Sequence, residues 1–368
     1  MPQNTEKHHH KDGVKIMSDI SVLDKNLAVE NSLGRSDIDF YNVRKEPFSV
    51  YGVMHENGRF CRIPEETARS ISDGVYQLSR HTSGGRVCFR TDSDFVAIVA
   101  EMAGIYIMPH EAFLGSSGFD LYVRENGKQT FAGAFMPDVS KKPHLEGTVK
   151  FPSRKMRDII INFPLYCGVC DINIGILQGA KIEKWSGYSR NVPMVFYGSS
   201  ITQGACANAP GTCYASLLSR RFDSDFINLG FSGNGKGEPA VFEYMAGLDM
   251  SLFLYDYDYN APSPEYLSQT HYAGYETMRK AHPDIPIIMA SRPNYGNPFA
   301  EGEARRKVIE ATYEKALASG DKNVYFADGA KVFADIFDEG ATVDGCHPTD
   351  YGFRIMAKVF GDIIEKVL

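Results

Sequence analysis

Apolar and polar residues alternate through most of the first half of the chain. From about Phe48 to Trp185 the apolar positions follow the two-residue period of half-buried strands. Phe119–Arg124 is an example, and Asn126-Gly127 then supplies a hairpin turn. Phe95–Ala100 is a continuous apolar run that suits a more buried strand. Because long helical stripes are absent here, the pattern predicts many short strands in a β-sandwich.

The pattern changes after Asn191, where short apolar runs alternate with segments of helical period. Strands joined by helices in this way predict a parallel sheet that is covered on both faces. In such a sheet, ligands bind beyond the carboxyl ends of the strands. The five expected strands are Val192–Tyr197, Phe226–Leu229, Ser251–Tyr257, Ile285–Ala290 and Val324–Ala327. The expected helices are Tyr214–Arg221, Glu265–Ala281, Ala300–Ala318 and Asp350–Val367.

The length of 368 residues exceeds the size of a single hydrophobic core, so two domains are expected. We place an all-β sandwich over residues 21–188 and an α/β domain over residues 189–368. Residues 1–20 are expected to be a disordered or artificially added tail, which includes His8-His9-His10. This segment lacks the apolar core of a secretory signal peptide. A native N-terminus would therefore indicate a cytoplasmic protein, whereas removal of a leader would indicate a secreted one.

The composition is that of an ordinary globular protein, with 43% hydrophobic and 23% charged residues. The formal net charge of −7 comes without a long acidic or basic run. Nucleic acid is not an expected partner, because no basic stripe is interleaved with aromatic residues. No membrane partner is expected either, since no apolar stretch reaches the length of a membrane span. A homo-oligomer is left open.

The cysteines argue for reduced thiols. The chain has seven of them, an odd number scattered along a mid-sized sequence. Cys167 and Cys170 have the CxxC spacing of a zinc site, but no second CxxC or histidine pair follows to complete one. We therefore interpret them as buried strand cysteines and predict no metal site.

Four loops at the expected strand ends carry residues with catalytic potential. Ser200 lies in a small-residue turn after the first strand, near N–H groups that can stabilise an oxyanion. Gly233 follows the second strand and can bring its N–H close to a carbonyl oxygen, while Asn260 directly follows the third strand. Asp344 stands three residues before His347, so its carboxylate can fold back and orient the imidazole.

Each of these loops has a plainer interpretation when it is taken alone. The Ser200 turn could be a helix cap or a phosphate-binding turn, although it does not match the Walker pattern. The Gly233 loop could be an ordinary connection, and Asn260 could form a turn before Ala-Pro. Asp344 could cap a helix beside a surface His347. The four loops together favour catalysis, because a parallel sheet brings its strand ends to a common edge.

These motifs, read in order, resemble those of the SGNH (GDSL-type) hydrolase superfamily. The resemblance covers about Val192–Leu368, roughly half of the chain. The matching residues are Gly198–Thr202 for GDSIT, Asn228–Gly233 for NxGxxG, Asn260 for the Asn of GxND, and Asp344 with His347 for DxxH. Two positions depart from the pattern, since Ser199 replaces an Asp and Asp258 replaces a Gly.

The resemblance implies a flavodoxin-like α/β fold with a five-stranded parallel sheet and a serine esterase activity. Ser200 would be the nucleophile, since its spacing to Ile201-Thr202 matches the motif and that of Ser199 does not. His347 would be the general base and Asp344 would hold it. The oxyanion hole would consist of the N–H groups of Ser200 and Gly233 and the amide of Asn260. No metal or organic cofactor is implied.

The first half adds a second resemblance. Gly118–Tyr122 matches the GxDLY signature of a β-rich region that precedes some SGNH hydrolases. The arrangement is similar to bacterial carbohydrate esterases, which place a jelly-roll-like domain before the SGNH domain. Leu114–Ser117 also contains a Gly-Ser-Ser triplet, but it lacks the Ile-Thr continuation and lies in a strand-rich region. We therefore do not expect a nucleophile there.

The substrate is expected to be a small-molecule or oligosaccharide ester, with an acetyl group on a carbohydrate favoured. Arg292, Asn294 and Tyr295 follow the fourth strand, and this aromatic and polar mixture suits a sugar. His110 and His144 of the β-rich half could also enter the cleft. The alternatives are a short-chain thioesterase and an acetyl-lipid hydrolase similar to the acetylhydrolases of platelet-activating factor. An inactive carbohydrate-binding protein is the alternative from another class.

Overall fold

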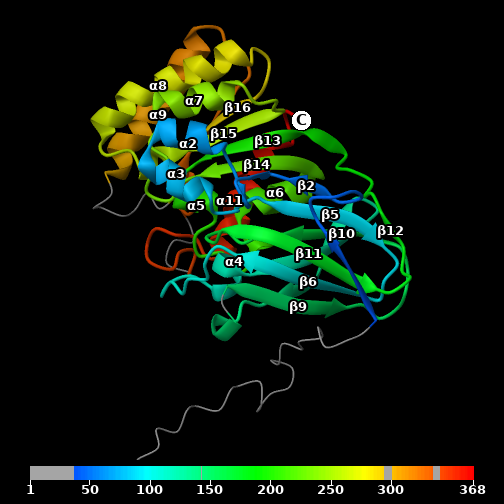
Figure 1. Ribbon diagram of the computed structural model, residues 1–368. Helices are drawn as coiled ribbons and strands as arrows, with labels where there is room; N and C mark the ends of the chain where they lie inside the picture. Colours follow the sequence, from blue (N-terminus) through cyan, green and yellow to red (C-terminus); the bar gives the residue numbers. More distant parts are fainter. Residues whose placement is uncertain (1–36, 142, 294–300, 335–339) are drawn as a thin grey trace, which may run out of the picture.

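The computed structural model describes residues 37–141, 143–293, 301–334 and 340–368 (Figure 1). The expected tail over residues 1–20 lies outside the described residues, and so do Asn294 and Tyr295. Within the described ranges the chain forms two antiparallel sheets, one parallel sheet and a small hairpin. No helix of these ranges is long and apolar enough to cross a membrane.

The two antiparallel sheets form the β-rich half. The first has the order β1 (Ile38–Asn42), β11 (Val169–Leu177), β6 (Phe95–Met102) and β9 (His144–Lys150). The second has the order β12 (Ile182–Glu183), β5 (Arg86–Thr91), β10 (Arg157–Asn162), β7 (Phe119–Glu125) and β8 (Lys128–Phe135), with β2 (Ser49–Tyr51) paired to β5. Alternate residues such as Ile172, Ile174 and Ile176 of β11 are buried in the core that both sheets share. The hairpin consists of β3 (Met54–Glu56) and β4 (Arg59–Cys61).

The parallel sheet has the flavodoxin-like order that the sequence resemblance implied. Its strands are β14 (Ser224–Gly230), β13 (Arg190–Gly198), β15 (Leu252–Asp256), β16 (Ile287–Ala290) and β17 (Val324–Ala327), in that order. Every neighbouring pair is parallel. The first strand of this region is therefore second in the sheet, and the chain order reverses beside it. The predicted fold class is confirmed, and all five expected strands are present with ends that differ by a few residues.

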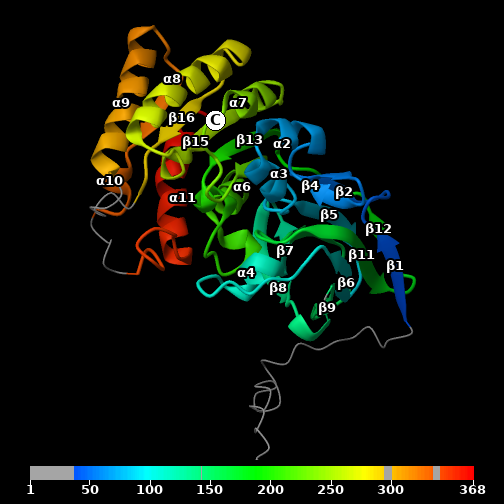
Figure 2. The same cartoon turned by 60° about the vertical axis from the view of Figure 1, so that its left-hand side comes forward.

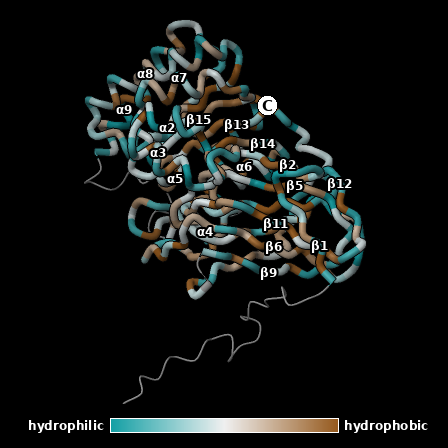
Figure 3. Tube along the Cα trace, viewed as in Figure 1, coloured by the Kyte–Doolittle hydropathy of each residue, from teal (hydrophilic) through white to brown (hydrophobic). Residues whose placement is uncertain are grey.

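Helices cover both faces of this sheet because its strands are apolar on both sides (Figures 2 and 3). Along β13, Met194 and Phe196 pack into one core cluster while Val195 and Tyr197 pack into the other. The first cluster is covered by α6 (Tyr214–Phe222) and α11 (Asp350–Ile364), and the second by α7 (Pro239–Ala246), α8 (Pro264–Ala281) and α9 (Gly302–Ala318). Shorter elements are α4 (Phe113–Ser117), α5 (Ser200–Gln203), α10 (Gly329–Val332) and the 3₁₀ turns Val139–Lys141, Pro210–Thr212 and Tyr257–Tyr259.

The first half is not uniformly β-stranded, in contrast to its sequence pattern. It contains α2 (Glu65–Ile71) and α3 (Asp73–Ser79), which lie beside α7 and the parallel sheet (Figure 1). Ala68 and Val75 belong to the same core cluster as Val195 of β13. Two helices of seven residues are too short to show a clear apolar stripe in the sequence. The boundary at residue 188/189 stays a prediction, and these helices show that the two halves share a core.

Candidate active site

The carboxyl ends of β13, β14 and β15 lie side by side at one edge of the parallel sheet. Gly198 of β13 pairs with Gly230 of β14 on one side and with Asp256 of β15 on the other. Gly230 has no space for a side chain, because a Cβ atom there would lie 2.1 Å from the backbone nitrogen of Gln203. This close approach seats α5 directly on the end of β14. The loops that follow the three strands are thereby brought together at the edge of the sheet.

Ser200 is the first residue of α5. The hydroxyl of Ser199 caps this helix by accepting a hydrogen bond from the N–H of Ile201 at 3.2 Å. The short helix ends at Gly204, whose φ of 108° lies in the left-handed region. Ser200 is 8% exposed, and its Oγ lies 2.9 Å from Nε2 of His347. The hydroxyl is therefore within hydrogen-bond reach of a base.

His347 lies in the loop before α11, where Asp344 holds it at two points. Nδ1 of His347 is 2.7 Å from Oδ2 of Asp344, and the backbone N–H of His347 donates to Oδ1 at 2.8 Å. The N–H of Cys346 donates to the same Oδ1 at 3.0 Å. Because a carboxylate only accepts, Nδ1 carries the proton and Nε2 is left to accept from Ser200.

The charge of Asp344 is stabilised by its hydrogen bonds. Burial by itself raises the pKa of Asp344, but the hydrogen bonds and the charge of His347, with the N–H of Cys346, outweigh it. The net pKa of Asp344 lies below its ordinary value. This carboxylate is therefore ionised at neutral pH, where it can stabilise an imidazolium on His347.

The Gly233 loop presents one N–H group without an acceptor. The N–H of Ser232 donates to Oε1 of Gln203 at 3.0 Å, and those of Asn234 and Gly235 donate to the carbonyl of Phe231. Among the described residues, no acceptor pairs with the N–H of Gly233, which has a φ of 68°. This N–H is therefore available for an oxyanion, and its role in the oxyanion hole stays a prediction.

Asn260 follows the third strand and connects two of the loops. Its Nδ2 donates one hydrogen bond to the carbonyl of Phe231 at 2.9 Å. An amide nitrogen has two donors, so a second N–H remains. The amide thus positions the loop that contains Gly233, a task that the sequence analysis did not anticipate, and keeps one donor beside it.

Asp258, one of the departures from the family pattern, ties the third loop to the fourth. Its Oδ2 accepts a hydrogen bond from the backbone N–H of Arg292 at 3.0 Å. Its carbonyl oxygen accepts from Nη1 of Arg305 at 2.6 Å. Burial raises the pKa of Asp258 to about 6, while the charge of Arg292 lowers it. Where the family pattern has a glycine, Asp258 thus forms buried hydrogen bonds that connect the two loops.

Arg292 is the single predicted substrate residue that lies within the described ranges. It is 7% exposed, and its guanidinium lies 4.1 Å from the centre of the Tyr259 ring. Burial raises the pKa of the Cys346 thiol, and the positive charge of Arg292 partly offsets this rise. Arg292 is thus near the loop of the base but largely enclosed, and its contact with substrate stays a prediction.

The β-rich half also reaches the site. His110 lies in the loop between β6 and α4, and its ring centre is 5.9 Å from that of His347. The ligand atoms of His110, Cys206 and His347 all lie within 4.8 Å of one another. Such a group could hold a metal ion, but both ring nitrogens of His347 already face Ser200 and Asp344. His144 is instead the first residue of β9.

The Gly-Ser-Ser segment of the first half forms α4, between the strands β6 and β7. The carbonyl groups of Gly115 and Ser116 accept hydrogen bonds from the N–H groups of Leu165 and Tyr166. The hydroxyl of Tyr166 donates to the carbonyl of Ser200 at 3.3 Å. This segment therefore supports the loop of the nucleophile through Tyr166.

Two buried titratable residues beneath the site were missed by the sequence analysis. Asp256 accepts hydrogen bonds from the hydroxyls of Thr202 and Tyr214, and burial raises its pKa to about 8. Arg62 donates to the carbonyls of Asn228 and Gly230 at 3.1 and 2.5 Å. The signal for both is a charged residue that interrupts or ends an apolar run, in Phe60-Cys61-Arg62-Ile63 and Leu252–Asp256.

Glu111, next to His110, gives a prediction on pH dependence. Burial raises its pKa to about 8, and no ion pair to it occurs in the described part of the chain. The unfolded chain releases this proton near pH 4, whereas the folded protein keeps it until about pH 8. The wild type should therefore lose stability as the pH rises through this window, and Glu111→Gln should not. Between pH 4 and pH 9, the free energy of unfolding of the wild type should fall by about 1 kcal/mol or more relative to that of Glu111→Gln.

Urea unfolding midpoints of both proteins at pH 4 and pH 9 would measure this difference. Glu310→Gln is a matched control, because Glu310 pairs with Arg306 on α9. Equal pH dependence of Glu111→Gln and the wild type would contradict the prediction.

The two halves of the chain each match a protein family. Residues 191–365 match the GDSL-like lipase/acylhydrolase family. Residues 38–182 match the GxDLY family, which is described as the N-terminus of esterases of the SGNH hydrolase type. Comparison with curated proteins gave no match.

Several solved structures share the whole architecture. A GDSL-like lipase from Bacteroides ovatus is 29% identical with a TM-score of 0.80, over 90% of this chain and 98% of its own. The salicylyl-acyltransferase SsfX3 from a tetracycline biosynthetic pathway is 20% identical with a TM-score of 0.75, over 91% and 99%. A family two carbohydrate esterase from Cellvibrio japonicus is 12% identical with a TM-score of 0.58, over 90% and 98%. The last two show the fold alone.

The parallel sheet and the two family matches together define a carboxylic ester hydrolase. More particularly, the chain belongs to the SGNH (GDSL-type) hydrolase superfamily, with a GxDLY-type region at its N-terminal side. Both resemblances that the sequence motifs suggested are confirmed.

Proposed function

We propose that the chain is a serine esterase that removes acetyl and other short acyl groups from carbohydrates. The observation that carries the proposal is the chain of contacts from Oγ of Ser200 to Nε2 of His347 and from Nδ1 of His347 to Asp344. In this arrangement a weak nucleophile has a general base within reach, and a third group orients the base.

The reaction follows in two balanced steps. Ser200 attacks the ester carbonyl as its proton passes to Nε2 of His347, and the oxyanion is held by the N–H groups of Ser200 and Gly233 and the amide of Asn260. The tetrahedral intermediate collapses, and His347 gives its proton to the departing alcohol. Water then attacks the acyl-enzyme, with His347 again taking the proton, and the carboxylic acid leaves as Ser200 regains its hydrogen.

A short acyl group is favoured by the crowding of the nucleophile. Ser200 is 8% exposed, and His110 and Cys206 approach the ring of His347. An acetyl group fits such a site more easily than a long chain. A carbohydrate is favoured by Tyr106, which is exposed in the same loop as His110, since an aromatic face suits the apolar face of a sugar ring. The likeness to a family two carbohydrate esterase is in keeping with this choice.

A substrate series tests the proposal. We expect p-nitrophenyl acetate to be hydrolysed at least tenfold faster, in kcat/KM, than p-nitrophenyl octanoate, because the longer chain must displace packed side chains. Acetylated xylose and glucose should release acetate. A preference for acetyl thioesters or acetylated lipids over acetylated sugars would instead support the alternatives, and a longer-chain preference would refute the short-acyl assignment.

A fluorophosphonate probe separates an esterase from a carbohydrate-binding protein without hydrolytic activity. We expect covalent labelling of Ser200 in the native protein, because the probe needs the activated hydroxyl. A folded protein that stays unlabelled would favour the binding protein.

A further inference from the structure

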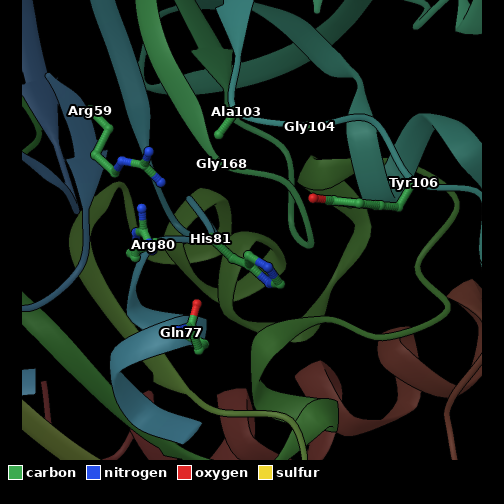
Figure 4. Close-up of a pocket in the computed structure, with 8 residues that line it drawn as sticks. All are labelled: Arg59, Gln77, Arg80, His81, Ala103, Gly104, Tyr106 and Gly168. Atoms are coloured by element: carbon green, nitrogen blue, oxygen red, sulfur yellow. The ribbon is translucent and has the colours of Figure 1, made fainter. Parts of the chain in front are cut away.

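A cavity of about 280 Å³ lies beside the catalytic centre, between β4, α3 and the loop after β6 (Figure 4). We call it the arginine pocket, and it is lined by Arg59, Gln77, Arg80, His81 and Tyr106 together with small residues. Its volume lies just below the range of about 300–1,000 Å³ that is usual for small-molecule sites, which suits a small ligand. The two-step reaction proposed above uses none of these side chains, and of them only Tyr106 has a role in the proposed function, in facing the sugar.

The pocket has two arginines and no acidic residue in its lining. Within the described ranges, neither guanidinium forms an ion pair or donates a hydrogen bond to protein, and that of Arg80 lies 5.3 Å from the centre of the Tyr76 ring. Figure 4 shows the guanidinium groups of Arg59 and Arg80 directed toward one another. Because arginine stays charged at all ordinary pH values, this arrangement is repulsive unless an anion lies between them.

A third arginine adds positive charge behind the pocket. Arg62 is 2% exposed and donates to the carbonyls of Leu78, His81, Asn228 and Gly230, and within the described part of the chain it forms no ion pair. Burial lowers its pKa to about 9, which still leaves it charged at neutral pH. The local charge of the three arginines therefore favours a negatively charged ligand.

His81 supplies a further donor, and its protonation state follows from its neighbours. Oε1 of Gln203 accepts from the N–H of Ser232, which fixes the amide so that Nε2 of Gln203 faces Nδ1 of His81 at 3.3 Å. Nδ1 of His81 is then an acceptor, and the proton of the neutral ring is on its Nε2. Burial, with the charges of Arg62 and Arg80, lowers the pKa of His81 to about 4, so the ring is neutral and offers one N–H.

We propose that the arginine pocket binds a small oxyanion, such as the carboxylate of an acidic sugar or a free phosphate. The two guanidinium groups provide paired N–H donors that match the oxygen atoms of a carboxylate or phosphate, and the Tyr106 hydroxyl is directed toward the same space (Figure 4). This inference goes beyond the proposed esterase function, and binding to the pocket does not require that function.

The side chain of Gln203 connects the pocket to the catalytic centre. Gln203 is the last residue of the helix that begins with Ser200, and it contacts both His81 and the N–H of Ser232, next to Gly233. An anion that orders His81 therefore acts on the two loops of the oxyanion hole. An anionic group on the alcohol part of a substrate would be held on the side of the β-rich half.

Titration calorimetry with inorganic phosphate and with D-glucuronate tests the proposal on the intact protein. We expect both anions to bind the wild type, D-glucose not to bind, and Arg59→Gln and Arg80→Gln to bind more than tenfold more weakly. Arg154→Gln removes the same charge at an exposed position of the β-rich half, where Arg154 pairs with Asp92, and should bind like the wild type. Equal binding by all the variants, or no binding by the wild type, would overturn the proposal.

Kinetics distinguish the source of the anion. If the anion belongs to the substrate, kcat/KM for acetylated methyl glucuronide should exceed that for acetylated methyl glucoside at least tenfold, and Arg59→Gln should remove the preference. If it is free, phosphate should change the hydrolysis of p-nitrophenyl acetate by the wild type and not by Arg59→Gln. A lack of esterase activity would refute the proposed function while the calorimetry still decided the pocket.

Discussion

Replacing Ser200 by alanine should reduce the kcat for p-nitrophenyl acetate by about 10⁶-fold, because the nucleophile and its contact with His347 are lost together. The remaining turnover would come from the oxyanion donors and from binding alone. The fold should persist, since α5 is capped by Ser199 and Ser200 makes no side-chain contact that holds the helix. Initial rates and thermal unfolding of the same preparation would check both expectations.

Ser199→Ala is the matched control for this variant. This substitution removes the hydroxyl of the neighbouring residue, which caps α5 by accepting from the N–H of Ile201 and does not face His347. Loss of a helix cap costs about 1 kcal/mol in stability, so we expect a lower melting temperature and activity within tenfold of the wild type. If Ser199→Ala were inactive and Ser200→Ala active, the assignment of the nucleophile would be wrong.

Asp344→Asn should reduce kcat by about 10⁴-fold while leaving the protein folded. The amide of asparagine can donate to Nδ1 of His347, which would favour the tautomer with its proton on Nε2, facing Ser200. That tautomer cannot take the proton of the nucleophile. The negative charge that stabilises the imidazolium is also lost, and the pKa of Asp344 shows that this charge is present in the native protein at neutral pH.

Separate measurement of kcat and KM distinguishes the loss of the orienting carboxylate in Asp344→Asn from general damage to the structure. We expect kcat to fall with KM nearly unchanged, since Asp344 contacts His347 and the loop backbone rather than the proposed substrate position. Asp328→Asn, at a carboxylate that caps α10 and pairs with Arg306, is a suitable comparison and should leave kcat within tenfold. A large rise in KM with unchanged kcat in Asp344→Asn would contradict its role in orienting the base.

The proximity of the candidate site residues could be predicted because the topology places them. Ser200, Gly233 and Asn260 follow neighbouring strands, and a parallel sheet brings such positions to one edge whatever the loops contain. The apolar runs of these strands and the apolar stripe of α8 are long enough to read from the sequence. Their periodicity reflects burial that every strand and helix of this architecture requires.

The supporting residues could not be predicted, because contacts distant in sequence define them. Arg62 is 166 residues from Asn228, whose carbonyl it binds, and nothing in the local pattern indicates that pair. His110 and Glu111 lie in a loop without periodicity, so their approach to His347 depends on how the halves pack. Asp258 departs from the family pattern, and no local motif indicates that it accepts a hydrogen bond from the backbone of Arg292.

Arg62 also bears on how the two halves of the chain can vary. Its guanidinium joins the carbonyls of Leu78 and His81, which flank the end of α3, to those of Asn228 and Gly230 at the end of β14. The strand that leads to the oxyanion loop is therefore clamped by a residue that precedes α2, and α2 and α3 share a core with β13. The β-rich half is consequently an integral part of the esterase, and exchanging it for another domain would remove the donor that holds the end of β14.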